Sequence, residues 1–135
     1  LVVPGMVARG LGHVVNIGSI NGLHAIGDTP VYGAAKAAVH MIGALLRIDL
    51  VGRHVRVTEV CPGRVETEFH IQSMGDARAA RETFYEGRRV LDPEDVAAAV
   101  LFALEAPAHV NVGLIELTPV RQVPGGVAFP MEPPA

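Results

Sequence analysis

The chain has 135 residues, of which 50% are hydrophobic, with a formal net charge of −3, six histidines and one cysteine. This length allows one domain at most, the apolar content excludes a disordered acidic chain, and the single cysteine excludes internal disulfides and a cysteine-rich zinc site. The acidic balance offers no basic surface for a phosphate backbone, so we expect no nucleic-acid partner.

The amino-terminal residues do not resemble a targeting segment. The chain begins at Leu1 in apolar sequence, with neither the charged region nor the small-residue cleavage site of a signal peptide. The longest uninterrupted apolar run, from Val96 to Leu104, is far shorter than the roughly 20 residues that span a bilayer. We therefore expect a cytoplasmic protein that does not enter a membrane.

The first predicted strand covers residues 13–17, with the sequence HVVNI. Its valines and isoleucine are typical of a parallel strand that is buried on both faces. Gly10 and Gly12 come before this strand and are therefore predicted to form a turn. A glycine pair that binds phosphate would instead connect a strand to the helix after it.

A helix is predicted over residues 31–51. Asp28 and Thr29 supply capping oxygens, Pro30 suits the first turn, and Gly52 ends the pattern. The helix is apolar nearly all round, whereas a helix that covers a sheet needs only one apolar stripe. Its second face is therefore expected to pack against another partner.

The second half of the chain continues the alternation of strands and helices. Residues 55–61, VRVTEVC, predict a strand that ends at a Pro62–Gly63 turn. A capped helix follows over residues 92–106, and residues 112–117 predict a last strand. This order favours an α/β fold, with a doubly wound parallel sheet of the Rossmann type.

Charge and proline are unevenly distributed along the chain. About half of the charged residues lie between Arg64 and Asp95, so residues 64–91 are interpreted as a solvated excursion from a buried scaffold. Half of the prolines lie in the last 17 residues, and residues 124–135 are therefore predicted to be an extended tail. Residues 1–123 then form the folded part.

Three polar side chains are predicted to share one pocket. Ser19 directly follows the first strand, where ligands bind in open α/β sheets. Tyr32 and Lys36 are four positions apart and lie on one face of the helix. A lysine cation near a phenol favours the phenolate, which makes the tyrosine a usable acid and base. A serine hydroxyl can stabilise negative charge on a substrate oxygen.

The segment NIGSINGLHAIGDTPVYGAAKAAVHMIGALLRIDL resembles the catalytic block of the short-chain dehydrogenase/reductase family, with Ser19 13 positions before Tyr32. The resemblance continues through VRVTEVCPGRVETEF, which is similar to a strand and proline-glycine turn of that family. The last third is similar to the branch of NADP-dependent 3-hydroxy acid and serine dehydrogenases. This implies an NAD(P)-dependent oxidoreductase that interconverts a secondary alcohol, such as a 3-hydroxy acid, and a ketone.

The resemblance also implies roles for single residues. Ser19, Tyr32 and Lys36 would be catalytic, with Tyr32 as the general acid and base, and Ser19 and Tyr32 would bind the substrate. The residues implied to contact the NADP or NAD cofactor are Asn16, Ile17, Tyr32, Lys36, Pro62, Gly63, Val65 and Thr67. Thr67 could equally cap a helix that begins near Glu68.

Residues 64–91 would correspond to the substrate loop of the family. An arginine fork suits a carboxylate, and Arg64 is the first of five arginines in or beside this loop, with Arg78, Arg81, Arg88 and Arg89. Arginines in such a segment are more often a solvated face, so both interpretations stay open. The six histidines have no paired spacing, and no metal site is expected.

The resemblance covers the carboxyl-terminal half of the family's domain. LVVPGMVARG is similar to the end of the helix before the catalytic strand, so the family's glycine-rich turn would lie upstream of Leu1. The helix over residues 31–51 would form a homodimer or homotetramer interface. Two alternatives remain, namely a ketoacyl thioester reductase or other alcohol dehydrogenase of the same family, and a non-catalytic chain that retains only the oligomer interface.

Overall fold

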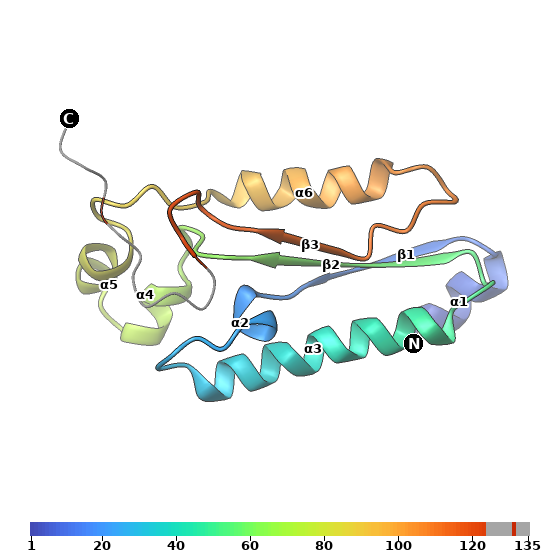
Figure 1. The fold of residues 1–135 in the computed structure, drawn as a ribbon, viewed down its shortest axis with the longest axis horizontal. Helices are drawn as coiled ribbons and strands as arrows, with labels where there is room; N and C mark the ends of the chain where they lie inside the picture. Colours follow the sequence, from blue (N-terminus) through green and yellow to red (C-terminus); the bar gives the residue numbers. More distant parts are fainter. Residues whose placement is uncertain (124–130, 132–135) are drawn as a thin grey trace.

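A three-stranded parallel sheet forms the centre of the computed structural model, which describes residues 1–123 and Met131 (Figure 1). The strand order is β1-β2-β3, and both neighbouring pairs are parallel. The strands are β1 (Gly12–Ile17), β2 (Val55–Pro62) and β3 (Leu114–Leu117). The predicted α/β class and the predicted strands are confirmed, with boundaries that differ by at most two residues.

β2 is the most deeply buried strand. It lies between β1 and β3, and Val57 and Val60 are only 1% and 0% exposed. Strand β2 is covered on both faces, so residues 57–61 are all buried, including the polar Thr58 and Glu59. Cys61 is fully buried in this strand, as expected for a small apolar residue.

Helices cover both faces of the sheet. Helices α1 (Val2–Arg9) and α3 (Pro30–Asp49) lie on one face, and α6 (Pro93–Glu105) lies on the other (Figure 1). A hydrophobic cluster joins α1 and the end of α3 to the sheet, with Leu50, Val55 and Val57 at its centre. This arrangement confirms the doubly wound architecture. Gly10 ends α1 with φ 63°, which confirms that it belongs to a turn. The prediction was wrong for Gly12, which is the first residue of β1 and pairs with Val55 of β2.

The start of α3 differs from the prediction in its capping. The helix runs from Pro30 to Asp49, with Pro30 in the first turn as expected, but Thr29 makes no side-chain hydrogen bond that caps it. The Thr29 hydroxyl instead accepts a hydrogen bond from Asn21 Nδ2 at 2.8 Å and donates to the carbonyl of Ile26 at 3.3 Å. Thr29 therefore links the segment before α3 to the short helix after β1, Ile20–Leu23. In α6, by contrast, the predicted capping box between Asp92 and Asp95 is present.

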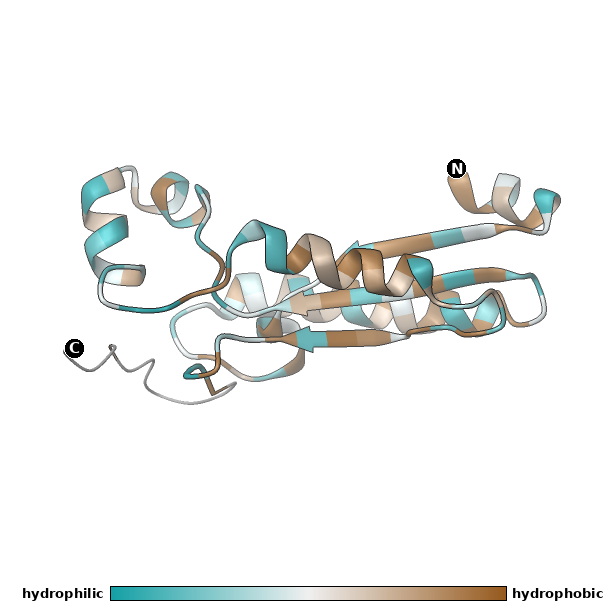
Figure 2. Ribbon diagram, turned by 90° about the horizontal axis from the view of Figure 1, so that it is seen from above, coloured by the Kyte–Doolittle hydropathy of each residue, from teal (hydrophilic) through white to brown (hydrophobic). Residues whose placement is uncertain are grey.

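The charged excursion forms a lobe at one end of the sheet, which Figures 1 and 2 show from two sides. It contains α4 (Phe69–Met74) and α5 (Ala77–Phe84). The two ends of the excursion meet, because Glu66 N donates to the Leu91 carbonyl at 2.9 Å and Leu91 N donates to the Arg64 carbonyl at 3.0 Å. The excursion therefore leaves and rejoins the scaffold at one place. The predicted tail over residues 124–135 lies outside the described residues, apart from Met131.

Helix α3 is long and apolar enough, by length and composition alone, to cross a membrane. Core helices of soluble proteins meet the same criterion. In this fold α3 lies along the sheet, and its His40 forms an ion pair with Glu59 of β2. Several of its apolar side chains are nevertheless more than half exposed: Met41, Ile42, Leu45 and Ile48.

Arg56 is predicted to stabilise the end of α6. Its guanidinium donates to the carbonyls of Ala103 at 2.9 Å, Leu104 at 3.0 Å and Ala106 at 3.3 Å. Arg56→Met keeps the stem of the side chain but removes these charged hydrogen bonds, so we expect a loss of about 1–2 kcal/mol in the free energy of unfolding. Denaturant titration checks this. The exposed Arg53, replaced in the same way, should show no comparable loss.

Candidate functional site

The turn after β1 positions Ser19. This residue is only 6% exposed and is the N-cap of the short helix α2 (Ile20–Leu23). The Ser19 hydroxyl accepts a hydrogen bond from Asn21 N at 3.2 Å. The capping bond orients the Ser19 side chain at the carboxyl end of β1, where ligands bind in sheets of this type.

Helices α2 and α3 approach each other closely at Gly22. A Cβ atom added to Gly22 would lie 2.7 Å from both the carbonyl carbon and the carbonyl oxygen of Lys36. A Cβ atom at Gly33 would likewise lie 3.3 Å from the Asn21 carbonyl oxygen. Glycine at these positions allows the Ser19 turn to pack against the first turns of α3, which carry Tyr32 and Lys36.

Lys36 connects α3 to the end of β1. Its Nζ donates a hydrogen bond to the Ile17 carbonyl at 2.9 Å and lies 5.8 Å from the centroid of the Tyr32 ring. The structure therefore brings Ser19, Tyr32 and Lys36 to one end of the sheet, although their catalytic roles stay predictions. The side-chain amide of Asn16 lies beneath α3, because a Cβ at Gly43 would be 3.3 Å from its Nδ2.

The loop that leaves β2 is held by residues that the sequence did not single out. Gly63 N donates to the Leu117 carbonyl at 2.8 Å, and Arg64 N donates to Gln122 Oε1, also at 2.8 Å. A Cβ atom on Gly63 would collide with Gln122 Oε1. Gln122 therefore fixes the loop from Pro62 onward, and nothing in its sequence context indicated this contact.

The rest of this loop is fixed by the lobe. Val65 forms an isolated bridge with Leu91, and the Tyr85 hydroxyl donates to the Thr67 carbonyl at 3.1 Å. The Thr67 hydroxyl accepts a hydrogen bond from Phe69 N at 3.3 Å at the start of α4. The N-cap of α4 is Glu68, so Thr67 lies one position before the cap and contacts the first helical residue only through this bond.

A row of aromatic rings connects Tyr32 to the lobe. The Tyr32 and Phe69 ring centroids are 5.3 Å apart, and His70 stacks on Phe84 with a centroid distance of 3.8 Å. Burial, and then the positive charge of Arg64, lower the pKa of His70. This environment favours a neutral imidazole, which suits its stacked position.

Arg64 packs against the end of α5. Its guanidinium carbon lies 5.3 Å from the centroid of the Phe84 ring, and Nη1 donates to the Phe84 carbonyl at 3.4 Å. Burial lowers the pKa of Arg64, and the nearby charge of Arg88 lowers it further. The Arg64 side chain is thus half-buried between the lobe and the loop after β2.

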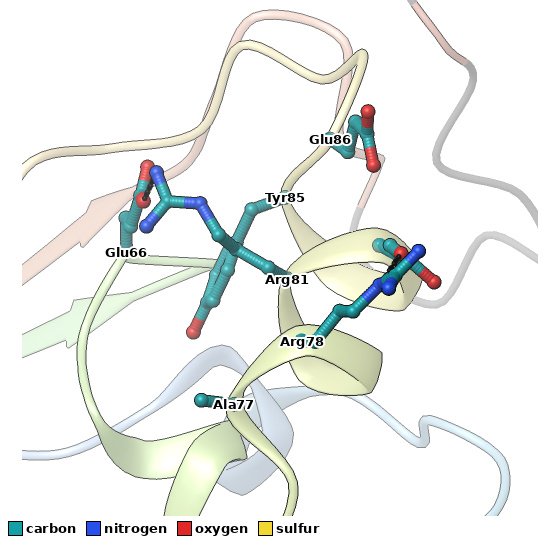
Figure 3. Close-up of a pocket in the computed structure, with 7 residues that line it drawn as sticks. Glu66, Ala77, Arg78, Arg81, Tyr85 and Glu86 are labelled. Carbon is teal, nitrogen blue, oxygen red and sulfur yellow. Dashed lines mark hydrogen bonds and ion pairs between the residues drawn. The ribbon is translucent and has the colours of Figure 1, made fainter.

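A pocket of about 520 Å³ opens on the lobe (Figure 3). Its two arginines are already paired with carboxylates: Arg81 lies 3.0 Å from Glu66, and Arg78 lies 2.7 Å from Glu82. None of Ser19, Tyr32 and Lys36 lines it. Its lining residues are Glu66, Ala77, Arg78, Arg81, Glu82, Tyr85 and Glu86.

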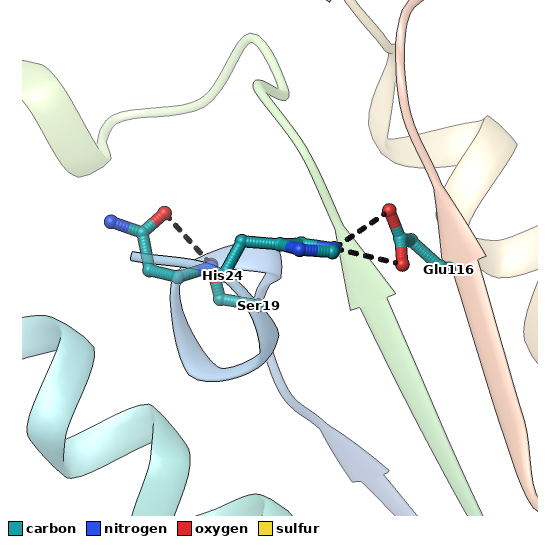
Figure 4. A network of polar contacts seen from close by, with 4 residues as sticks. Ser19, His24 and Glu116 are labelled. Carbon is teal, nitrogen blue, oxygen red and sulfur yellow. Dashed lines mark hydrogen bonds and ion pairs between the residues drawn. The ribbon is translucent and has the colours of Figure 1, made fainter. Parts of the chain in front are cut away.

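Two histidine–glutamate pairs join α2 and α3 to the sheet. His24, the C-cap of α2, lies 3.1 Å from Glu116 of β3 and therefore spans the end of β2 (Figure 4). His40 of α3 lies 2.7 Å from Glu59 of β2. Sequence reasoning missed both pairs. For the second there was a signal, namely a glutamate within an apolar strand. Among the described residues, no group of three or more side chains could hold a metal ion.

Comparison with known proteins extends over most of the chain. Residues 1–77 match the profile of the family described as short chain dehydrogenase. The chain is 44% identical over 129 residues to an NADP-dependent 3-hydroxy acid dehydrogenase of Salmonella typhi, covering 94% of this chain and 52% of the relative. It is 42% identical to sulfoacetaldehyde reductase 2 of Chromohalobacter salexigens, covering 90% of this chain and 48% of the relative.

The structure is similar to the closed form of a serine dehydrogenase complexed with NADP+. The TM-score is 0.88 at 43% identity, with 94% of this chain and 52% of that chain covered. The chain thus spans about half the length of the curated relatives it matches.

Gly22→Ala is predicted to separate α2 from α3. The added methyl group would overlap the Lys36 backbone at 2.7 Å, so we expect a loss of about 1–3 kcal/mol in the free energy of unfolding. Denaturant titration followed by circular dichroism measures this loss. Gly27→Ala is the matched control, because its Cβ would meet no atom within 4 Å. Equal stability of the two variants would contradict the close packing.

Proposed function

The chain belongs to the short-chain dehydrogenase family, and from this premise we propose that it takes part in hydride transfer between NADP and a secondary alcohol or the corresponding ketone. One observation carries the proposal. Lys36 Nζ donates to the Ile17 carbonyl at 2.9 Å and lies 5.8 Å from the Tyr32 ring, beside the turn that holds Ser19. A phenol, an ammonium and a hydroxyl group are the side chains that this reaction needs.

Each of the three side chains has a distinct proposed role. During oxidation, Tyr32 takes the proton from the alcohol hydroxyl, and during reduction it returns a proton to the carbonyl oxygen. The positive charge of Lys36 favours the phenolate form of Tyr32. The Ser19 hydroxyl donates a hydrogen bond to the substrate oxygen, where negative charge develops on the alkoxide.

The donor set around Lys36 fits a nicotinamide cofactor. Its ammonium group has three N–H donors, and the bond to Ile17 uses one, which leaves donors for ribose hydroxyls. The cofactor, when bound, supplies or accepts the hydride. NADP is supported over NAD by the similarity to an NADP-dependent 3-hydroxy acid dehydrogenase and to a serine dehydrogenase complexed with NADP+. The residues proposed to hold it are Asn16, Ile17, Tyr32, Lys36, Pro62, Gly63, Val65 and Thr67.

We propose a 3-hydroxy acid as the substrate class, which the similarity to the 3-hydroxy acid dehydrogenase of Salmonella typhi supports. Arg64 is the arginine proposed to meet the acid group, because it borders the loop after β2. Arg78 and Arg81 lie within 3.0 Å of Glu82 and Glu66 and line the pocket on the lobe.

The apolar face of α3 supports assembly into a homodimer or homotetramer. Met41, Ile42, Leu45 and Ile48 are each more than half exposed on this one helix. An exposed apolar patch of this kind typically marks an interaction surface. A second copy of the chain, related by twofold symmetry, is the proposed partner.

Tyr32→Phe tests the proposed chemistry in the full-length protein. Without the hydroxyl no proton can be transferred at this position, so kcat should fall at least about 100-fold, while affinity for NADPH changes little. Turnover is followed by NADPH absorbance and binding by fluorescence titration. The control is Tyr85→Phe, which removes the other tyrosine hydroxyl of the chain and should cost less than about tenfold. Undiminished turnover by Tyr32→Phe would rule out this mechanism.

Ile48→Glu tests the proposed assembly. A carboxylate within an apolar interface is costly to bury, so the variant should sediment as a smaller species than the unmodified protein. Val120→Glu places the same charge on an exposed position in the turn after β3 and should not change the sedimentation coefficient. If both variants keep the assembly of the unmodified protein, α3 is not the interface.

A further inference from the structure

A glutamate lies inside the central strand of the sheet. Glu59 of β2 is only 4% exposed, and its Cα partner in β1 is Asn16. A buried carboxylate is costly unless it is paired and hydrogen-bonded, and an apolar side chain of similar volume often serves stability as well or better. Stability alone therefore does not explain a glutamate at this position.

The two oxygens of the Glu59 carboxylate lie against different segments, namely α3 and the residue that follows β1. Oε2 lies 2.7 Å from Nδ1 of His40 in α3. Oε1 lies beside Gly18, directly after β1, because a Cβ atom added to Gly18 would collide with it. The carboxylate thus lies between the helix that carries Lys36 and the residue that precedes Ser19.

Cys61 shows how closed this region is. A Cβ atom on Gly18 would also come 2.7 Å from its sulfur, so the thiol and the carboxylate border the same glycine. Burial, and then the negative charge of Glu59, raise the pKa of Cys61 to about 12, so the thiol stays protonated. The contacts of Gly18 with both side chains fix the position of the Glu59 carboxylate that His40 meets.

His40 lies where it can determine the position of Lys36. The two residues are four positions apart in α3 and therefore lie on the same helix face, with Lys36 one turn nearer the site. His40 is held against β2, and Lys36 Nζ donates to the Ile17 carbonyl at the end of β1. A single helix face is thus fixed to two neighbouring strands, one turn apart.

We propose that His40 and Glu59 form a positioning pair for the reaction. By fixing α3 against β2, the pair holds Lys36 where its ammonium group reaches the Ile17 carbonyl and lies beside the Tyr32 ring. This inference rests on the proposed function, and it assigns neither residue a contact with substrate or cofactor. The pair acts only through Lys36 and Tyr32.

The test compares two substitutions of His40 in the full-length protein. His40→Leu removes the hydrogen bond, whereas the side-chain amide of His40→Asn can still donate near the position of Nδ1. We expect kcat to fall about 10-fold to 100-fold in His40→Leu, since small displacements of catalytic groups have effects of this size. The KM for the alcohol should change less than kcat, and His40→Asn should recover most of the loss.

The matched control is His13→Leu. It removes another 2.7 Å histidine hydrogen bond, from His13 Nε2 to Thr58 Oγ1 between β1 and β2, near the opposite end of β1. This variant should lose thermal stability and keep its kcat. If His13→Leu lowers kcat as much as His40→Leu does, at an equal loss of Tm, the positioning proposal is wrong.

Crystal structures of the His40 variants provide a readout that does not depend on turnover. The distance from Lys36 Nζ to the Ile17 carbonyl, 2.9 Å here, should lengthen beyond hydrogen-bond range in His40→Leu and persist in His40→Asn. An unchanged distance together with an unchanged kcat in His40→Leu would overturn the proposal. If the unmodified protein turns over no secondary alcohol, the proposed function is wrong. The distance from Lys36 Nζ to the Ile17 carbonyl in the two variants then shows by itself whether the pair positions Lys36.

Discussion

The close approach of α2 and α3 is the constraint on which the candidate site depends. Glycine at position 22 lets the backbone of the Ser19 turn contact the backbone of Lys36, and any side chain there would overlap the Lys36 carbonyl. The contact joins a serine fixed by a helix cap to a tyrosine and a lysine fixed by helix periodicity. The geometry of the site therefore depends on backbone packing, which is stiffer than packing between flexible side chains.

Hydrogen bonds made by buried polar residues of β2 also hold the sheet and α3 in place. Glu59 and Thr58 are buried polar residues of β2, and both have hydrogen-bond partners in other elements. Apolar packing joins α1 and α3 to the sheet through Leu50, Val55 and Val57. Apolar contacts of this kind contribute stability without direction, whereas the hydrogen bonds select one register of helix on strand.

Local sequence patterns predicted the parallel sheet, the two long helices and the grouping of Ser19, Tyr32 and Lys36. These features depend on short-range periodicity, caps and strand ends, which a single sequence records. The capping of α3 was predicted wrongly, because Asn21 competes for the Thr29 hydroxyl through a contact between separate segments. The bonds from His24 to Glu116 and from Arg64 to Gln122 connect residues 92 and 58 positions apart, and no local pattern indicates such pairs.

The two ends of the lobe are hydrogen-bonded to each other, and this determines how the fold can vary in length. The hydrogen bonds between Glu66 and Leu91 and between Leu91 and Arg64 pin the two ends of the excursion beside the exit from β2. The entropy of closing a chain segment rises only slowly with its length, so residues added between these ends cost little. The segment can thus be lengthened, shortened or replaced as an exchangeable module. The strands and α3 beneath it keep their register, so one arrangement of Ser19, Tyr32 and Lys36 can be combined with lobes of different shape.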